Sequence, residues 1–455
     1  MKKDNRISPY RKFIFGALIS CLLGLSMFSC QKDAIVEGIA GLEFSTDTVA
    51  FDTVFTTMGT ITRQVKVFNP SDNPVEIETL SLRGGRSSRF RLNVDGDTAL
   101  VQHGVTILPQ DSIFIFVRAN INPNDETTPF VVEDAILLQG GNTQKQIALS
   151  AWGRNAIYHN PDHVLRNADG SYPLDAFGNP YRYSVIDCDN WRHDLPHVII
   201  GYAVVDSRNT LTLKDGDELY FHNDAVLWVY DSATLKVQGT AETPVLFTSI
   251  RHDSHYNKLP GQWGYIWLST GSKDNEISNA IIENGYVGIL ADTNVNNNPT
   301  LKIENTIIRN QSMAGIMGQT AWIEGSNVLV HTCGTATLAL QYGGKYAFSS
   351  STFADYWRYN SRTNPSVVLN NHYSYQGSEY LYDAMQISFS DCIIYGNYSE
   401  GEMLIDLDDR VSHTLTISHS IVKGGEWDED PLFTDTENDD YTLQENSPAQ
   451  GIGWQ

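Results

Sequence analysis

A nine-residue pattern of apolar, small and polar positions recurs six times between residues 277 and 425. The sixth position of every copy is apolar, and the fourth is small. A short motif that recurs every 20 to 30 residues or so is typical of a solenoid, in which each repeat buries its apolar face on its neighbours. The six copies span residues 277–285, 303–311, 324–332, 348–356, 389–397 and 417–425.

The copies are rich in β-branched residues and punctuated by Gly and Asn, which favours strands over helices. We therefore predict a right-handed parallel β-helix over residues 198–425, with like residues stacked about 4.8 Å apart from coil to coil. The regular leucine spacing of a leucine-rich repeat is absent. The copy that begins at Glu324 fits the pattern least well at its first position. The small fourth positions are Ala280, Thr306, Asn327, Ser351, Cys392 and Ser420, and the apolar sixth positions are Ile282, Ile308, Leu329, Phe353, Ile394 and Val422.

Residues 41–153 contain short runs of alternating apolar and polar residues with turn-forming residues between them. The runs at 62–68 and 113–117 are examples, and their spacing suits a β-sandwich. Residues 65–70 and 108–116 resemble the immunoglobulin-like domains of the hydin type. That resemblance implies a spacer or interaction module, and the segment contains no catalytic constellation.

Residues 236–248 and 263–266 resemble the opening coils of right-handed β-helix proteins of the pectin-lyase-like class. Residues 430–449 resemble the closing cap of that superfamily. The superfamily includes lyases, hydrolases, adhesins and inert scaffolds, so the resemblance implies an all-β fold and not a particular chemistry. We expect a connector and entry cap at residues 154–197 and a C-terminal cap at residues 426–455.

The first 29 residues have a basic start and an apolar run at residues 13–28, which is typical of an export signal peptide. Residues 27–30 resemble a bacterial lipobox, and this resemblance implies cleavage before Cys30 and its acylation. The charged residues 31–33, within a tether at 30–40, resemble the signal that sends some gram-negative lipoproteins to the cell surface. We expect a lipid-anchored, surface-exposed outer-membrane protein; the alternative is an ordinary signal peptide with an incidental Cys.

The charge of the chain limits its partners. The 455 residues carry a formal net charge of −23, and loss of the signal peptide changes it to −27, because five basic residues and one acidic residue leave. Such a charge argues against nucleic acid as a partner. It would also repel a polyanionic polysaccharide unless cations intervened. The remaining cysteines, Cys188, Cys333 and Cys392, are too few and too scattered for a disulfide framework.

None of the catalytic sets known on this fold is complete. Pectin-type hydrolases carry paired carboxylates, a Gly-His-Gly and an Arg-Ile-Lys, and the nearest matches here are residues 408–410 and His419. Glu283 and Arg309 occupy the same position of adjacent copies, which indicates an exposed ion pair more readily than a lyase base. We expect no cofactor: calcium could bind Asp406, Asp408 and Asp409, but their spacing is not specific.

His193 and His197 invite a metal interpretation. Two histidines four residues apart on an extended segment do not share a face, and no third ligand is near in sequence. Structural packing is the favoured interpretation.

The long excursion between the fourth and fifth copies concentrates aromatic residues, and long excursions on a regular scaffold are often functional. Aromatic faces stack on sugar rings and anchor protein interfaces. An alternative of equal weight is a loop that packs its aromatics on the solenoid wall. The candidate ligand-binding residues are Tyr356, Trp357, Tyr359, Tyr373 and Tyr375. The segment 260–267, with Trp263 in it, is a second candidate site.

These observations favour a non-enzymatic surface lipoprotein whose solenoid binds a polysaccharide or a cell-surface protein. The alternative from another class is a polysaccharide lyase or glycoside hydrolase that acts in a groove on one face of the coils.

Overall fold

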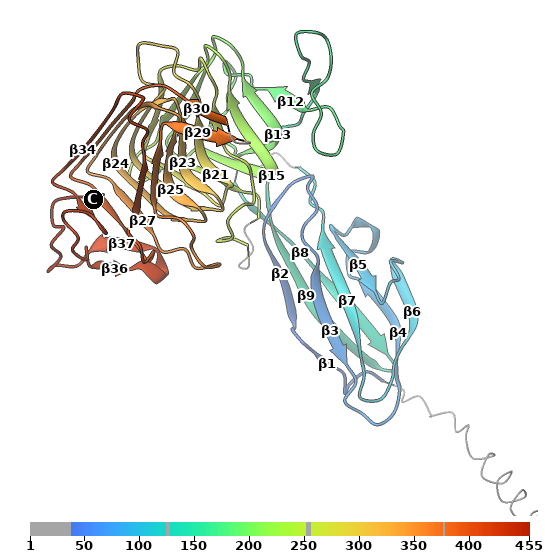
Figure 1. Ribbon diagram of the computed structural model, residues 1–455. Helices are drawn as coiled ribbons and strands as arrows, with labels where there is room; N and C mark the ends of the chain where they lie inside the picture. The colour runs from blue at the N-terminus through green and yellow to red at the C-terminus, as the bar shows by residue number, and fades with distance from the viewer. Residues whose placement is uncertain (1–37, 124–127, 252–255, 376–377) are drawn as a thin grey trace, which may run out of the picture. The chain divides into compact units, whose positions relative to one another are not determined.

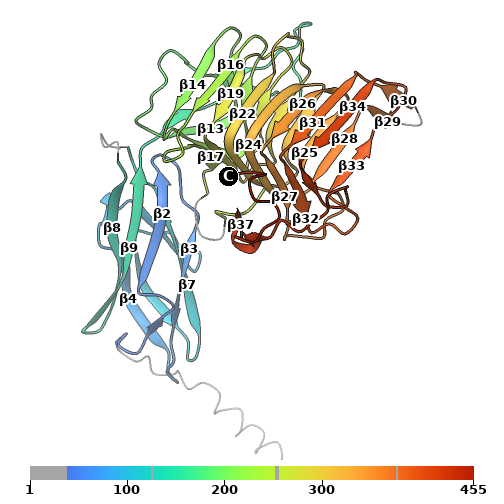
Figure 2. The ribbon, with the colours of Figure 1, turned by 90° about the vertical axis from the view of Figure 1, so that its left-hand side faces the viewer.

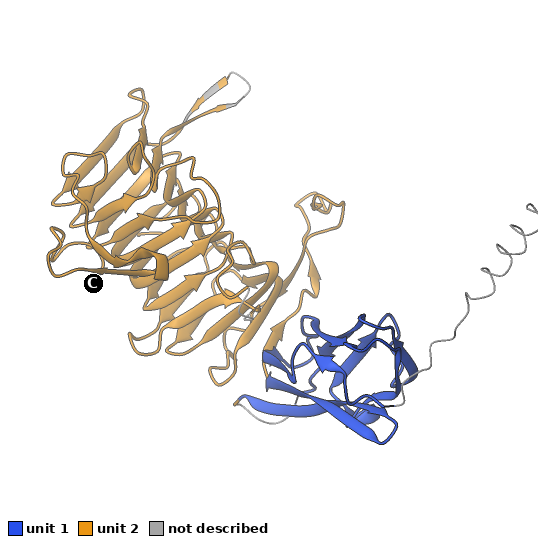
Figure 3. Ribbon diagram, turned by 90° about the horizontal axis from the view of Figure 1, so that it is seen from below, with its two compact units in different colours: residues 1–123, 129–154 blue, residues 124–128, 155–455 orange. Residues whose placement is uncertain are grey.

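The computed structural model describes residues 38–123, 128–251, 256–375 and 378–455. These residues are almost entirely β-strand and turn, with two short 3₁₀ helices, η2 (Gly85–Ser87) and η3 (Thr436–Asn438), so the predicted all-β class is confirmed. No helix among them has the length and apolarity to cross a membrane. The chain forms two compact units that divide between residues 154 and 155 (Figure 3).

The N-terminal unit is a sandwich of two sheets, as expected for residues 41–153. One sheet has the order β1-β3-β7-β5 and the other β2-β9-β8-β4-β6, and every pair is antiparallel except β2 and β9. Its likeness to hydin-type domains stays a prediction. The strands are β1 (Glu43–Phe44), β2 (Thr48–Phe55), β3 (Arg63–Phe68), β4 (Val75–Leu82), β5 (Phe90–Val94), β6 (Val101–Ile107), β7 (Ser112–Ala119), β8 (Phe130–Gly140) and β9 (Thr143–Arg154).

The C-terminal unit is a parallel β-helix, whose coils stack in chain order (Figure 1, Figure 2). Each full coil contributes to three parallel ladders, here called sheets 1, 2 and 3. The strands before the first full coil are β10 (Ile157–His159), β11 (His163–Val164), β12 (Arg182–Val185) and β13 (His197–Val205). Long strands turn a corner between two sheets: β13 does so, and so do β15 (Glu218–Val229), β22 (Leu301–Gln311) and β24 (Trp322–Cys333).

Sheet 1 contains β14 (Thr210–Lys214), β16 (Thr234–Gln238), β19 (Asn275–Ser278), the first halves of β22 and β24, β26 (Gly344–Ser349), β31 (Met385–Ser390) and β34 (His413–Ser418). Sheet 2 contains the first half of β15, β17 (Val245–Ser249), β20 (Ala280–Glu283), the second halves of β22 and β24, β27 (Thr352–Asp355), β32 (Ile393–Gly396) and β35 (Ile421–Val422). Sheet 3 contains the second half of β15, β18 (Ile266–Leu268), β21 (Val287–Ala291), β23 (Ala314–Gln319), β25 (Ala336–Gln341), β28 (Val367–Asn370) and β33 (Met403–Asp406).

One internal column runs the length of sheet 2, as the repeated pattern predicts. Each member pairs in register with the member on the next coil, and all are buried. This burial supplies the main favourable free energy of the solenoid. The column consists of Leu219, Phe247, Ile282, Ile308, Val330, Phe353, Ile394 and Val422.

The third copy of the pattern is displaced by one residue from its predicted position. Ile303 pairs with Gly325, and Gly325 with Phe348, so the copy begins at Gly325. Its inward members are therefore Val328 and Val330, where we predicted Asn327 and Leu329. The pattern is hard to recognise here because its first position is Gly325 and not an apolar side chain. The Phe348 ring of the next coil occupies that space, and a Cβ at Gly325 would lie 2.5 Å from that ring.

The recurring Asn at the third position has a backbone explanation. It forms the corner between sheets 1 and 2, where one residue takes the left-handed conformation that Asn and Asp tolerate better than most residues. His419 occupies this corner in the last copy, which supports a ladder position over a catalytic role. The corner residues are Asn279, Asn305, Asn327, Ser350, Asp391 and His419, with φ between 45° and 54°.

The C-terminal segment, residues 426–455, packs on the outer face of sheet 2. Phe433, Tyr441 and Ile452 form a cluster there with Leu329 and Ile393. The segment includes a hairpin of β36 (Phe433–Asp435) and β37 (Asp440–Leu443).

The last coil leaves two residues of the inward-facing columns half exposed. Ile405 is 51% exposed and Ile417 is 41% exposed. At this end of sheets 1 and 3, the solenoid thus presents uncovered apolar side chains.

A buried ionic cluster holds the first part of the aromatic excursion to the solenoid. Arg362 donates to both carboxylate oxygens of Glu402, at 2.7 and 2.8 Å, and its Nε lies 3.3 Å from an Asp355 carboxylate oxygen. All three side chains are buried. Two carboxylates share one guanidinium. Burial raises the pKa of Asp355 to about 7, although the charge of Arg362 lowers that pKa.

Neighbouring isoleucines test the internal column. Ile282→Ala should lower the free energy of unfolding by about 2–5 kcal/mol, because it opens a cavity in the column. Ile281→Ala, on the outward side of the same strand, should cost under about 1 kcal/mol. Denaturant melts of both variants measure the difference, and equal losses would contradict the orientation of β20.

The Asp355 pKa predicts a pH dependence of stability. In the unfolded chain this carboxyl has an ordinary pKa of about 3.9, so the folded chain binds more protons between about pH 4 and pH 7. The stability that this group contributes therefore falls as the pH rises through that window.

Asp355→Asn should make the decline of the melting temperature between pH 5 and pH 8 shallower. Asp383→Asn, at an exposed position, is the control, and matching slopes for Asp355→Asn and wild type would count against the shifted pKa.

Candidate functional site

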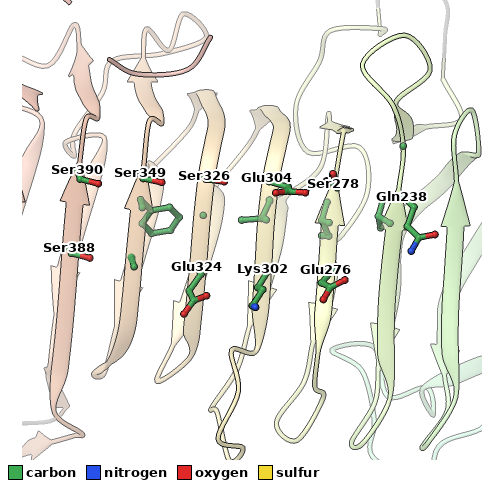
Figure 4. A pocket seen from close by; sticks show the side chains of 17 residues that line it. Gln238, Glu276, Ser278, Lys302, Glu304, Glu324, Ser326, Ser349, Ser388 and Ser390 are labelled. Carbon is green, nitrogen blue, oxygen red and sulfur yellow. Dashed lines mark hydrogen bonds between the residues drawn. The ribbon is translucent and has the colours of Figure 1, made fainter. Parts of the chain in front are cut away.

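A groove of about 740 Å³ lies on the outer face of sheet 1 (Figure 4). Strands β16, β19, β22, β24, β26 and β31 line it. Alternate residues of a strand face opposite sides of a sheet. In sheet 1, the residues immediately before and after each inward position therefore face this groove. The groove side chains are therefore arranged in columns that follow the stacking of the coils.

Two polar columns follow the groove, with neighbours about 4.8 Å apart along the coils. The first contains Glu276, Lys302 and Glu324 on successive coils, in register, and continues with Ala347 and Ser388. The second is dominated by hydroxyl groups (Figure 4). It contains Gln238, Ser278, Glu304, Ser326, Ser349 and Ser390.

The carboxylates of the groove each have a partner. Glu276 pairs with Lys236 at 2.9 Å, and Glu304 accepts a hydrogen bond of 3.1 Å from the Ser278 hydroxyl. Glu324 accepts a hydrogen bond of 3.1 Å from the Trp322 indole N–H.

The Lys302 ammonium group makes no ion pair with any residue that the structure describes. Because it lies between two glutamates of its column, this part of the groove offers both donors and acceptors.

This arrangement is suited to hydrogen bonding more than to acid–base catalysis. A glycosidase needs one carboxyl that keeps its proton in an apolar environment and a second one across the scissile bond. The Glu276 side chain is 53% exposed and bound to Lys236. Glu324, two coils away on the same column, is bound to the edge of Trp322.

Trp263 does not belong to a ligand site. It is 1% exposed and stacks on Phe221 at 4.1 Å inside the solenoid, and its N–H donates to the Glu283 carbonyl. The prediction for Trp263 is therefore wrong, because a fully covered ring cannot contact a ligand.

The excursion separates into two parts with different roles. In the first, Tyr356 packs on Phe433 and Tyr441, and Trp357 is buried with its N–H bonded to Asn360. Here the structure favours the packing alternative. Tyr359 is partly exposed, and its hydroxyl donates to the Lys258 carbonyl.

The second part of the excursion is a hairpin of β29 (His372–Tyr375) and β30 (Ser378–Leu381). Tyr373 and Tyr380 pair across it with ring centroids 6.5 Å apart, and Tyr342 and Tyr382 adjoin them. The Tyr375 side chain lies outside the described ones. Tyr373 therefore remains a candidate for contact with a ligand, separate from Tyr356 and Trp357.

The histidines and acidic residues considered as metal ligands have other partners. His197 stacks on Trp191 at 3.4 Å and lies 2.9 Å from His159, and burial lowers the pKa of His159 to about 4 and that of His197 to about 3. These contacts favour the packing interpretation. No three His, Cys, Asp or Glu side chains of the described residues come together as a cation site.

The other charged candidates are also accounted for by local pairs. Asp408 binds Arg410, whose hydrogen bonds lower the Asp408 pKa. Asp406 binds His372 at 3.0 Å. Arg309 and Glu283 form the predicted ion pair, at 2.7 Å, but it is partly buried and not exposed as expected.

Sequence reasoning missed the groove residues of sheet 1, although the repeat contains the information. They stand immediately before and after the first position of each copy, as Glu276 and Ser278 do around Ile277. With the third copy moved to Gly325, the same rule identifies Glu324 and Ser326.

Comparison with known proteins finds a family model that matches part of the solenoid. Residues 265–447 match the family model described as a right handed beta helix region. No curated protein matches the chain.

Three solved structures show weak similarity. The catalytic unit of a thermostable GH87 alpha-1,3-glucanase from Streptomyces thermodiastaticus has 12% identity and a TM-score of 0.23, over 80% of this chain and 76% of that one. A family 123 glycoside hydrolase from Clostridium perfringens has 10% identity and a TM-score of 0.19, over 26% of this chain and 30% of that one. A PapD-like domain of human CEP192 has 6% identity and a TM-score of 0.17, over 28% of this chain and 96% of that one.

The chain thus spans less than a third of the length of the family 123 hydrolase. At these identities and TM-scores the three structures carry no argument about activity. The family match and the parallel ladders together identify residues 265–447 as a right-handed β-helix region.

Proposed function

We propose that this protein binds glycan at the cell envelope without cleaving it, and that the sheet 1 groove holds an extended polysaccharide of low charge. The observation that carries the proposal is the pair of polar columns along the groove. They repeat hydroxyl, carboxylate and ammonium groups at the spacing of the coils. A polymer with many hydroxyl groups can make similar hydrogen bonds on each coil that it crosses.

The charges of the groove favour a ligand without many charges of its own. Lys302 lies between Glu276 and Glu324, so this column alternates an ammonium with carboxylates, and the groove as a whole contains more carboxylates than ammonium groups. A polyanion would meet the glutamates and the net charge of −23 on the chain. A neutral glycan meets no such barrier and can use both donors and acceptors.

A hydrolase or lyase is the alternative function. Glu276, Glu304 and Glu324 are three carboxyl groups in one groove, and glycoside hydrolysis uses two. The partners of these carboxyls favour the binding function, because each is bound to an ammonium, a hydroxyl or an indole N–H. Release of reducing ends or unsaturated products by the purified protein would decide for the enzyme.

Filling the groove tests the binding site. Ser349→Trp places a bulky ring in the hydroxyl column. We expect the retention of this variant by neutral polysaccharides in affinity gels to fall about tenfold or more, which corresponds to about 1.4 kcal/mol.

Ser418→Trp is the matched control, because Ser418 continues the same column by register but does not line the groove. It should keep wild-type retention. Equal retention of all three proteins, with unchanged melting temperatures, would remove the groove from the proposal.

We also propose that the chain is anchored in the outer membrane by acylation of Cys30, with the sandwich as a spacer. Residues 1–37 lie outside the described residues, so this proposal is supported by the sequence alone. Several acyl chains at about 0.8 kcal/mol per buried CH₂ hold a protein firmly on a membrane.

Cys30→Ser should therefore move the protein from the membrane fraction to the soluble fraction and abolish incorporation of labelled fatty acid. Cys21→Ser is the control within the signal peptide. Protease treatment of intact cells then determines which side of the membrane the protein faces, and a membrane-bound, unlabelled Cys30→Ser protein would refute the anchor.

A further inference from the structure

A second pocket, of about 250 Å³, lies on the outer face of sheet 3 and is bordered by the connector before the first coils. The wall from the solenoid includes Trp228 of β15, Trp267 of β18 and the nearby Tyr265. The connector contributes Tyr181, Tyr183 and Leu165, among others. None of these residues lines the sheet 1 groove, so the two sites are separate.

Aromatic rings in fixed orientations form most of this pocket. Trp228 and Trp267 stack in register on adjacent strands, with centroids 4.7 Å apart and planes within 14°. Tyr202 meets Trp228 edge-on at 6.3 Å, and Tyr181 meets Tyr202 edge-on at 5.8 Å. The walls therefore present faces and edges at right angles, a shape that can surround a small ring.

Hydrogen bonding fixes one wall of the pocket, and polar groups of another wall keep their protons. The Trp267 indole N–H donates to an Asp292 carboxylate oxygen at 2.7 Å, which holds that ring in place. The Trp228 N–H is buried and has no hydrogen-bond partner among the described residues. Burial raises the pKa of Tyr202 to about 12, so its hydroxyl keeps its proton at neutral pH and can donate.

The charge of the pocket limits the class of ligand. Arg182 is the one charged residue that lines it, and within the described chain its guanidinium makes no ion pair. An aromatic cage for a quaternary ammonium ion works through ring faces and is weakened by a nearby cation. A guanidinium instead offers five N–H donors to oxygen acceptors.

We propose that this pocket binds a single pyranose ring of a glycan, with the apolar face of the sugar on the aromatic wall and its oxygen atoms toward Arg182. The volume is below the range of about 300–1,000 Å³ for drug-sized ligands, which suits one sugar unit and not a longer segment. The oxygen atoms that face Arg182 belong either to the hydroxyl groups of a neutral sugar or to the carboxylate of a uronic acid.

The proposal does not depend on the sheet 1 groove, because the two sites share no residue. A protein whose groove binds nothing could still bind a sugar here, and the reverse also holds. The test therefore uses small glycosides, which are too short to span the groove coils.

The probes are methyl glucopyranoside and methyl glucopyranosiduronate, added to the mature full-length protein. Binding is measured by saturation-transfer NMR and by the quenching of tryptophan fluorescence. We expect binding of at least one probe, and Trp267→Ala should weaken it about tenfold or more, because this variant removes a ring on which the apolar face of the sugar stacks.

Tyr181→Ala is a second variant, since its ring lies on the connector and its loss spares the solenoid core. Tyr286→Ala, at an exposed aromatic residue outside the pocket, is the control and should bind like wild type. Ser349→Trp should also leave this binding unchanged, which separates failure here from failure of the groove.

Arg182→Gln distinguishes the two sugar classes. If the ligand is a uronic acid, this variant should lose affinity for the uronate and keep its affinity for the neutral glycoside. If the ligand is neutral, the loss should be similar for both. Absence of binding by both probes, or equal binding by wild type, Trp267→Ala and Tyr181→Ala, would overturn the proposal and leave the pocket as a packing gap.

Discussion

The stacking of like residues from coil to coil is the constraint on which the solenoid depends. Parallel strands hydrogen-bond in a register that places each coil directly on the last, so an inward Ile282 requires an inward Ile308 and Val330. Because side chains alternate across a strand, this requirement also decides which residues face outward. The outward residues are then free to differ from one sheet to the next without loss of the core.

The internal pattern was therefore predictable from sequence, while the groove was not. The repeat predicted the β-helix and the inward positions Ile282, Phe353 and Ile394, because apolar residues at fixed spacing have few other uses. The prediction failed at the third coil because the Phe348 ring occupies the space that a side chain at Gly325 would fill. A small residue on one coil thus compensates for a large residue on the next. A one-residue error exchanges the two faces of a strand, and the outward Glu324 column could not be recognised until that register was corrected.

Aromatic residues were easy to notice in the sequence, but their roles could not be assigned from it. The excursion was correctly recognised as unusual, yet its rings serve two purposes: Trp357 is buried and its N–H donates to Asn360, whereas Tyr373 is 40% exposed on its hairpin. Packing and binding both use the large apolar area of an aromatic ring, so composition alone cannot separate them. Trp228 was not singled out as a ligand-binding residue, and Trp267 was included only as the end of the candidate segment 260–267. The two tryptophans are 39 residues apart and become neighbours only through the stacking of coils.

The three sheets surround one rigid core, and their outer faces differ from one another. The C-terminal segment covers the later coils of sheet 2 through Phe433 and Tyr441. Sheet 1 presents polar columns, and sheet 3 begins with stacked tryptophans. Since each coil contacts only its neighbours, a change on one face reaches another only through the shared core. A ligand on a rigid ladder also costs little ordering of the protein. If both proposed sites bind parts of the same glycan, the gain comes from effective concentration and not from a conformational change, and the affinities of the two sites should be measurable one at a time.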